Sequence, residues 1–455
     1  MALGRRQTRQ TELFIPTAQL APGPGHPFYT KLNAVLAETG FDAFTEELCA
    51  PHYKEGGRPG LPPGTYFRML FIGYFEGIDS QRGIAWRCAD SLALRGFLGL
   101  ALTEATPVHA TLSVIRQRLP EDVFDRVFQF VLGLLDEQGL IRGRTLGIDA
   151  TTLEANAAMK RIVRKDTGAD WKAYLRALAQ AEGIENPTDA DLQRLDRRRP
   201  DKKVSNAHWE SPSDPAARIA RMKDGTTHLA YKAEHAVDLQ TEAIVAATVT
   251  PADRGDGASG AETLIVTQWN LHQSGSQAAV SELVADKGYH DNRLLAQCAD
   301  WQVRTYIPER KQKSRVWTDK PGAYERAFRG NRRRVRGAKG RRLNRWRSER
   351  CERTFAQVCE TGGGRRSWLR GLSNVTKAHG LKCAAYNLGL LLRKVWGLGK
   401  PRSAAGFWAL LFRLWTVWKH WLGGGARRSS IASTFGPAAS RPSPQLAARR
   451  KSPLY

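Results

Sequence analysis

Residues 144–155, RTLGIDATTLEA, decide the fold, because the helical periodicity of the preceding chain changes here to a β-rich pattern. The chain after them predicts strands at 228–239 and 242–252, a helix at 261–273, a strand at 281–288, a helix at 290–301, a strand at 303–308 and a helix around Glu352. Successive strands indicate a meander, whereas strands separated by helices indicate parallel pairing. We therefore expect a mixed sheet of three meandering and two parallel strands, flanked by helices.

This order of elements is the layout of a ribonuclease H-like α/β fold. Before it, apolar residues at three- and four-residue spacing in 29–40, 65–77 and 123–139 predict an all-α N-terminal domain. The expected divisions are a basic arm at 1–27, a helical domain at 28–140, a ribonuclease H-like domain at 141–398 with insertions near 160–224 and 309–350, and a C-terminal region at 399–455.

Charge points to a polyanionic partner. The chain has 70 Lys and Arg against 44 Asp and Glu, a formal net charge of +26, which favours nucleic acid over a small neutral ligand. The segment 309–350 holds 17 Lys and Arg against four acids, interleaved with aromatic residues. Because such a density of cations repels itself unless phosphates neutralise it, we expect this segment to contact DNA; the alternative is a solvated basic loop.

Other features argue against secretion, disulfides and a membrane span. The N-terminus lacks the apolar core of a secretory signal, so we expect a protein that stays inside the cell. The six cysteines form no CxxC pair and are expected to be buried free thiols. Residues 406–422 are Trp-rich but short and interrupted by basic residues, which favours an amphipathic helix, followed by a disordered basic tail.

Two aspartates end apolar strands. Asp149 lies in the first strand and Asp286 follows the fourth, and these two strands are neighbours in the expected sheet. Adjacent carboxylates repel, so a divalent cation between them is the economical explanation, and oxygen ligands favour Mg²⁺ or Mn²⁺. The helix at 348–360 offers Glu349 and Glu352 as a third carboxylate. Three nearby histidines, His228, His235 and His290, are expected to be structural.

Five blocks in order give the chain a specific resemblance: 61–100, 147–157, 228–252, 283–291 and 352–377, within a match from about residue 28 to 398. Together they resemble the DDE transposases of bacterial insertion sequences. The resemblance implies Asp149, Asp286 and Glu352 as the catalytic acids, which would bind two Mg²⁺ or Mn²⁺ ions. It implies cleavage at element ends and transfer of the 3′-hydroxyl ends to target DNA, by two-metal phosphoryl transfer.

The third acid departs from the family pattern. Related transposases often have an Arg four residues before the Glu and a Lys seven after it, where this chain has Ser348 and Cys359. Glu349, with Arg345 four residues before it, therefore stays an alternative to Glu352.

The remaining expectations concern partners. The predicted DNA-contacting residues are Lys287, Arg332, Arg333, Arg334, Arg336, Arg365, Arg366 and Arg370. We expect the helical domain to serve DNA binding or assembly, the partner to be duplex DNA, and a homodimer or higher oligomer to act on it in the bacterial cytoplasm, at the nucleoid and away from membranes. Two alternatives are a transposase relic that only binds DNA and a ribonuclease H-like nuclease that cuts without joining.

Overall fold

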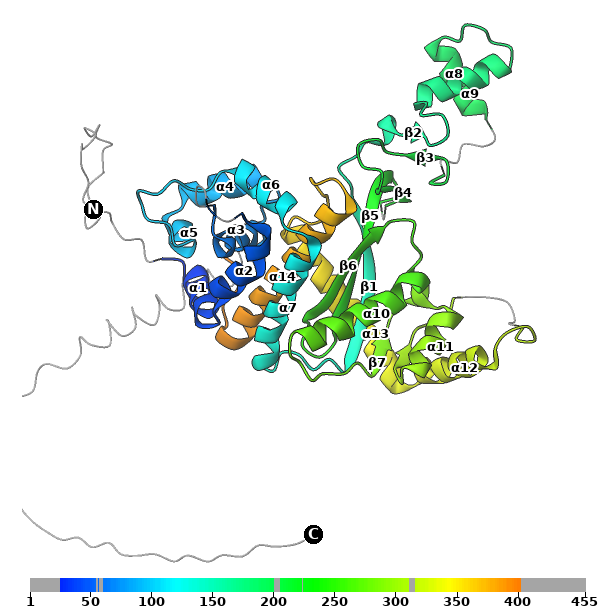
Figure 1. Ribbon diagram of the computed structural model, residues 1–455. Helices are drawn as coiled ribbons and strands as arrows, with labels where there is room; N and C mark the ends of the chain where they lie inside the picture. Colours follow the sequence, from blue (N-terminus) through cyan, green and yellow to red (C-terminus); the bar gives the residue numbers. More distant parts are fainter. Residues whose placement is uncertain are drawn as a thin grey trace, which may run out of the picture. The chain divides into compact units, whose positions relative to one another are not determined.

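The computed structural model describes residues 25–54, 56, 60–199, 205–222, 224–310 and 316–401 (Figure 1). The predicted Trp-rich helix at 406–422, the tail after it and almost all of the basic arm lie outside these residues. In the described ranges, no helix combines the length and hydropathy that crossing a bilayer requires.

The N-terminal region is helical, as predicted. Its elements are α1 (Pro27–Glu38), α2 (Phe41–Cys49), η2 (Ala50–His52), α3 (Pro63–Glu76), α4 (Gln81–Asp90), α5 (Leu92–Phe97), α6 (His109–Arg118) and α7 (Glu121–Glu137). Pro63 starts α3 and Gly77 ends it in the left-handed conformation, while Glu121 and Asp122 place negative charge at the start of α7. The boundaries thus follow the local helix signals.

The central sheet confirms the predicted mixed topology, but it has a sixth strand, Arg218–Arg221, which lies inside the predicted insertion at 160–224. Its strands are β1 (Thr145–Glu154), β4 (Arg218–Arg221), β5 (Thr227–Asp238), β6 (Ile244–Pro251), β7 (Glu282–Val284) and β8 (Arg304–Tyr306), in the order β4-β5-β1-β7-β8 with β6 also paired to β5. The β1–β5 and β5–β6 pairs are antiparallel, and β7 is parallel to both β1 and β8. The first and fourth strands of the predicted core are therefore neighbours.

Helices cover both faces of this sheet. They are α10 (Asp256–Gln273), η4 (Lys287–Tyr289), α11 (Asn292–Asp300), α12 (Gly322–Arg336), α13 (Ala338–Phe355), the π-helical segment η5 (Ala356–Thr361) and α14 (Leu372–Trp396). Consecutive residues of β5 alternate between the faces: Glu234 bonds to Ser259 of α10, and His235 bonds to Thr354 of α13. The middle of β5 is consequently buried from both sides.

One hydrophobic cluster joins the helical region to the sheet. It includes Phe28 and Tyr66 from the N-terminal helices, Ile148 from β1 and Leu391 from α14. The helices α7 and α14 pack against each other, and α14 also packs against β6 (Figure 1). The predicted division near residue 140 thus marks a change of secondary structure within one continuous core.

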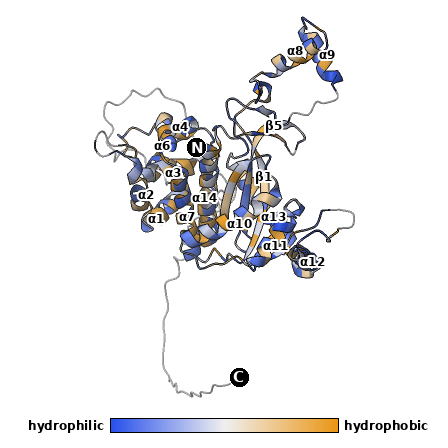
Figure 2. Ribbon diagram, turned by 45° about the vertical axis from the view of Figure 1, so that its right-hand side comes forward, coloured by the Kyte–Doolittle hydropathy of each residue, from blue (hydrophilic) through white to orange (hydrophobic). Residues whose placement is uncertain are grey.

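The two predicted insertions have ordered elements of their own. The first contains η3 (Met159–Arg161), β2 (Val163–Arg164), α8 (Trp171–Ala181), α9 (Asp189–Arg198) and β3 (Trp209–Glu210). Helices α8 and α9 pack through a separate cluster that includes Leu175 and Leu192. The second insertion contains α12 and most of α13. Figure 2 shows that α12 is largely hydrophilic. The helix that contains Glu352 therefore begins inside the basic segment.

Candidate active site

Two aspartates meet where β1 and β7 run side by side. Gly147 of β1 pairs with Val284 of β7 in parallel register. Asp149 and Asp286 each follow their member of this pair by two residues. Both aspartates line one cavity of about 210 Å³ together with Asp256, Lys232 and Tyr289. The structure thus brings together the first two predicted acids.

Each aspartate is oriented by local contacts. Asp149 Oδ1 accepts a hydrogen bond from the backbone N–H of Ala150 at 2.9 Å, and its Oδ2 forms an ion pair with Arg347 of α13 at 2.9 Å. Asp286 caps η4, accepting a bond from the N–H of Gly288 at 2.7 Å through Oδ1. Both carboxylates are partly exposed to solvent, so they combine a defined position with access to the cavity.

The cavity contains a third acid that the sequence reasoning missed. Asp256, the first residue of α10, forms an ion pair with Lys232 of β5 at 2.7 Å. An acid in the first turn of a helix is ordinary, so the sequence offered no signal that would separate Asp256 from a structural residue. Only the packing of α10 beside β5 and η4 brings this carboxylate to the two predicted ones.

A network of buried polar side chains adjoins the cavity. Lys232 Nζ donates to Ser259 Oγ at 2.9 Å, and Ser259 Oγ donates to Glu234 at 2.8 Å. Tyr289 donates to the same carboxylate at 2.6 Å. Burial, and then the negative charge of Glu234, raises the pKa of the Tyr289 hydroxyl above its ordinary range. The tyrosine therefore stays a donor and ties η4, next to Asp286, to β5.

The third predicted acid lies on α13, outside the residues that line this cavity. Glu352 is exposed, but it follows Cys351, whose buried thiol has a pKa raised by burial and also by the charges of Asp149 and Glu352. Cys351 packs against Gly147 of β1, so this turn of α13 lies beside the strand that contains Asp149. The alternative, Glu349, forms an ion pair with Arg353 at 2.6 Å, and Arg353 also pairs with Glu242 at the β5–β6 turn.

Two family models match the chain. The model described as Transposase domain (DUF772) matches residues 17–118, and the model described as Transposase DDE domain matches residues 198–388. The chain belongs to the DDE transposases of insertion sequences. No curated protein and no solved structure matches it. Asp149 lies before the range of the DDE match, so its assignment rests on its position beside Asp286.

Membership in this family means that the transposase acts on DNA and depends on a divalent metal. The carboxylates of the cavity fit that requirement, since Mg²⁺ and Mn²⁺ prefer oxygen ligands. Asp149, Asp256 and Asp286 supply such oxygens.

The four predicted DNA-contacting arginines of α12 divide into two pairs. Arg332 forms a bidentate pair with Glu309 at 2.6 and 2.7 Å, and Arg334 donates to the carbonyl and hydroxyl of Thr305 at 2.9 and 3.1 Å. Arg333 and Arg336 are exposed. The helix thus directs one pair of guanidinium groups at the transposase and the other at solvent.

The other predicted contacts lie next to Asp286 or along the C-terminal half of β1 and the residues after it. Lys287 is exposed immediately after Asp286. Arg365 donates to Thr151 of β1 at 3.1 Å, Arg366 lies over the exposed ring of Trp368, and Arg370 is exposed. These cations border the strand that contains Asp149.

Close packing accounts for the glycines in the turn after η5. Gly363 has φ +66°, and an added Cβ would collide with the carboxylate of Asp79. Lys382 of α14 donates to the carbonyl of Gly363 at 2.6 Å and to Asp79 at 3.4 Å. The TGGG segment (361–364) therefore anchors the region after Glu352 to the N-terminal helices.

Proposed function

We propose that the transposase cleaves DNA at the ends of its element and transfers the 3′-hydroxyl ends to target DNA. The observation that supports this most directly is the meeting of Asp149 and Asp286 at adjacent strands in one solvent-accessible cavity. We assign them as metal-holding acids, with Glu352 of α13 as the third.

The proposed roles follow from the contacts. Asp149 and Asp286 would hold two Mg²⁺ or Mn²⁺ ions, with Arg347 fixing the rotamer of Asp149. Bound divalent cations supply an activated water and stabilise the in-line displacement at phosphorus. Lys232, which lines the cavity and pairs with Asp256, limits repulsion among the carboxylates.

The DNA path is proposed over the exposed cations next to the cavity. Lys287 follows Asp286 directly, Arg366 and Arg370 lie at the C-terminal end of β1, and the exposed face of α12 and α13 adds further arginines. Phosphate contacts of this kind position a duplex without specifying its sequence. Because two element ends must be joined, we propose that at least two copies of the transposase assemble on the DNA.

The test uses the full-length transposase, a duplex containing an end of its element, and a supercoiled target plasmid. Asp149→Asn, Asp286→Asn and Glu352→Gln should each lower cleavage at least about 100-fold in Mg²⁺. DNA binding should stay nearly unchanged, because these acids hold metal and do not anchor phosphate.

Glu349→Gln is the matched control on the same helix and should retain cleavage. A dead Glu349→Gln beside an active Glu352→Gln would overturn the assignment of the third acid. Cleavage without any joined product in the wild-type reaction would identify a nuclease, and binding without cleavage would identify a DNA-binding relic.

A further inference from the structure

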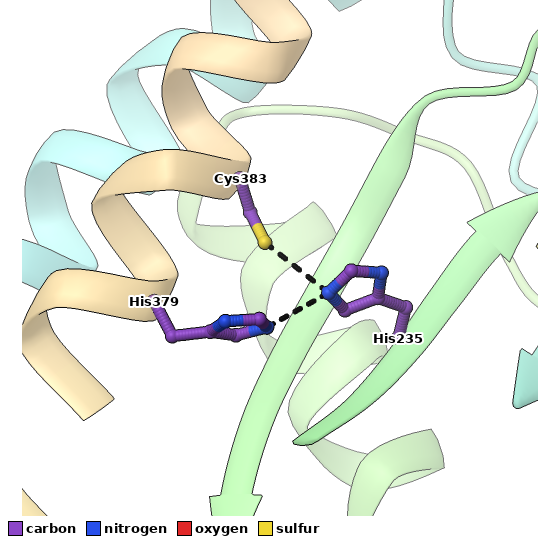
Figure 3. A group of neighbouring side chains, drawn as sticks. All are labelled: His235, His379 and Cys383. Carbon is purple, nitrogen blue, oxygen red and sulfur yellow. Dashed lines mark hydrogen bonds between the residues drawn. The ribbon is translucent and has the colours of Figure 1, made fainter. Parts of the chain in front are cut away.

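A second group of metal-ligand side chains lies in the core and does not line the acidic cavity. His235 of β5 and His379 and Cys383 of α14 gather there, and we call them the inner cluster (Figure 3). Their exposed fractions are 0%, 3% and 0%. The Nε2 atoms of the two histidines are 2.8 Å apart, and Cys383 Sγ is 3.4 Å from His235 Nε2.

Backbone geometry explains why the three meet. His379 and Cys383 are four residues apart on α14, so they lie on one helix face. His235 points toward them because β5 alternates its side chains between the two faces of the sheet. In the β1–β5 register His235 is the direct partner of Asp149. The inner cluster thus lies beneath the strand pair that positions the first catalytic acid.

Hydrogen bonding fixes which nitrogen of His235 has the free electron pair. Thr354 Oγ1 donates its proton to the carbonyl of Cys351 at 2.8 Å. It therefore accepts from His235 Nδ1, which lies 3.0 Å away. The neutral imidazole then has its lone pair on Nε2, directed at His379 and Cys383 (Figure 3). A histidine whose other nitrogen is held by a hydrogen bond is the usual form of a metal ligand.

We propose that His235, His379 and Cys383 bind a zinc-type transition-metal ion that ties β5 to α14. Nitrogen and thiolate ligands select Zn²⁺ and similar ions over Mg²⁺. Tetrahedral zinc with bonds of about 2.0 and 2.3 Å places ligand atoms roughly 3.3 to 3.6 Å apart. The Sγ–Nε2 separation already has this value, and the two imidazoles need to open by about half an ångström.

One more buried thiol lies in this part of the core. Cys359 of η5 is buried and belongs to the same hydrophobic cluster as Phe355, whose ring stacks on His235 with centroids 4.1 Å apart. Its sulfur is not among the ligand atoms that all lie within 4.8 Å of one another. The proposed protein ligands are therefore His235, His379 and Cys383.

The site would be structural and independent of the proposed catalytic ions. No substrate can reach ligands that are buried to this degree, so the ion would stabilise the packing of β5, α13 and α14. Its ligands differ in chemistry from the oxygen ligands of the acidic cavity. The two metals can therefore be measured separately in the same protein.

The test begins with the full-length protein expressed with added zinc, purified without chelator and analysed for bound metals. We expect stoichiometric zinc that resists dialysis. Protein refolded with Co²⁺ should show visible bands of tetrahedral cobalt and a near-ultraviolet thiolate-to-cobalt band, which an all-oxygen site cannot produce.

Variants then assign the ligands. Cys383→Ser should abolish the thiolate band or shift it strongly, whereas Cys298→Ser, another buried cysteine, should leave zinc content and spectrum unchanged. Thr354→Val, which removes the hydroxyl that accepts from His235 Nδ1 and donates to the carbonyl of Cys351, should weaken zinc binding about 10- to 100-fold. Wild-type protein that binds neither zinc nor cobalt beyond background, or a cobalt spectrum unaffected by Cys383→Ser, would overturn the proposal.

Discussion

The division of the α12 arginines makes a quantitative prediction about DNA binding. Each phosphate contact by a cation releases condensed counterions, so losing one contact flattens the plot of log affinity against log salt by about 0.9 on duplex DNA. If all four arginines at 332, 333, 334 and 336 touched phosphate, replacing them with Gln would reduce the slope by about 3.6. The structure predicts about half of that effect.

The reason is that two of the four side chains have partners within the protein. Arg332 is held by Glu309 and Arg334 by Thr305, whereas Arg333 and Arg336 are exposed and have no acidic partner among the described residues. The Arg333→Gln/Arg336→Gln variant should therefore flatten the slope by about 1.8. The matched variant Arg332→Gln/Arg334→Gln should leave the slope nearly unchanged and lower thermal stability instead.

The assay is fluorescence anisotropy at several salt concentrations, with an element-end duplex and an unrelated duplex of equal length. Phosphate contact predicts the same slope change on both duplexes, since it is independent of sequence. Circular dichroism spectra and melting curves show whether each variant is folded. Equal slope losses for the two double variants would refute the division, and an unchanged slope for Arg333→Gln/Arg336→Gln would remove α12 from the DNA path.

Further predictions concern metal, pH and the glycine turn. Cleavage should require Mg²⁺ or Mn²⁺ and weaken in Ca²⁺, whose coordination is larger and looser; full activity after exhaustive chelation would contradict this. Burial alone would raise the pKa of Glu282, but bonds from Lys339, Thr145 and Tyr306 outweigh it and lower the pKa below 4.5. The ionised Glu282 therefore stabilises the fold above that pH, and this stabilisation is lost as the pH falls through the lowered pKa. Urea unfolding should show that the difference in unfolding free energy between wild type and Glu282→Gln becomes smaller as the solution is acidified. Gly363→Ala should lower the unfolding free energy by about 2 kcal/mol, through its left-handed conformation and the collision with Asp79; an unchanged melting curve would contradict it.

Local sequence patterns determined much of the fold. The helices α3 and α7 begin and end at their Pro, Gly and acidic signals, and the strand and helix order from residue 144 onward predicted the mixed sheet. That order also placed the first and fourth strands together, which is why Asp149 and Asp286 were recognisable as a pair. The catalytic roles of the two acids stay a prediction for the cleavage assay.

Tertiary structure alone decided which side chains meet. Asp256, His379 and Cys383 showed no chemical signal in the sequence, because an acid at a helix start and single His or Cys residues within a helix are ordinary. The arginines at 332–336 are alike in sequence, and only the rotation of α12 against β8 and α11 separates the bound pair from the exposed pair. Periodicity acts between near neighbours in the chain and so fixes secondary structure, whereas these contacts depend on packing between segments more than 20 residues apart.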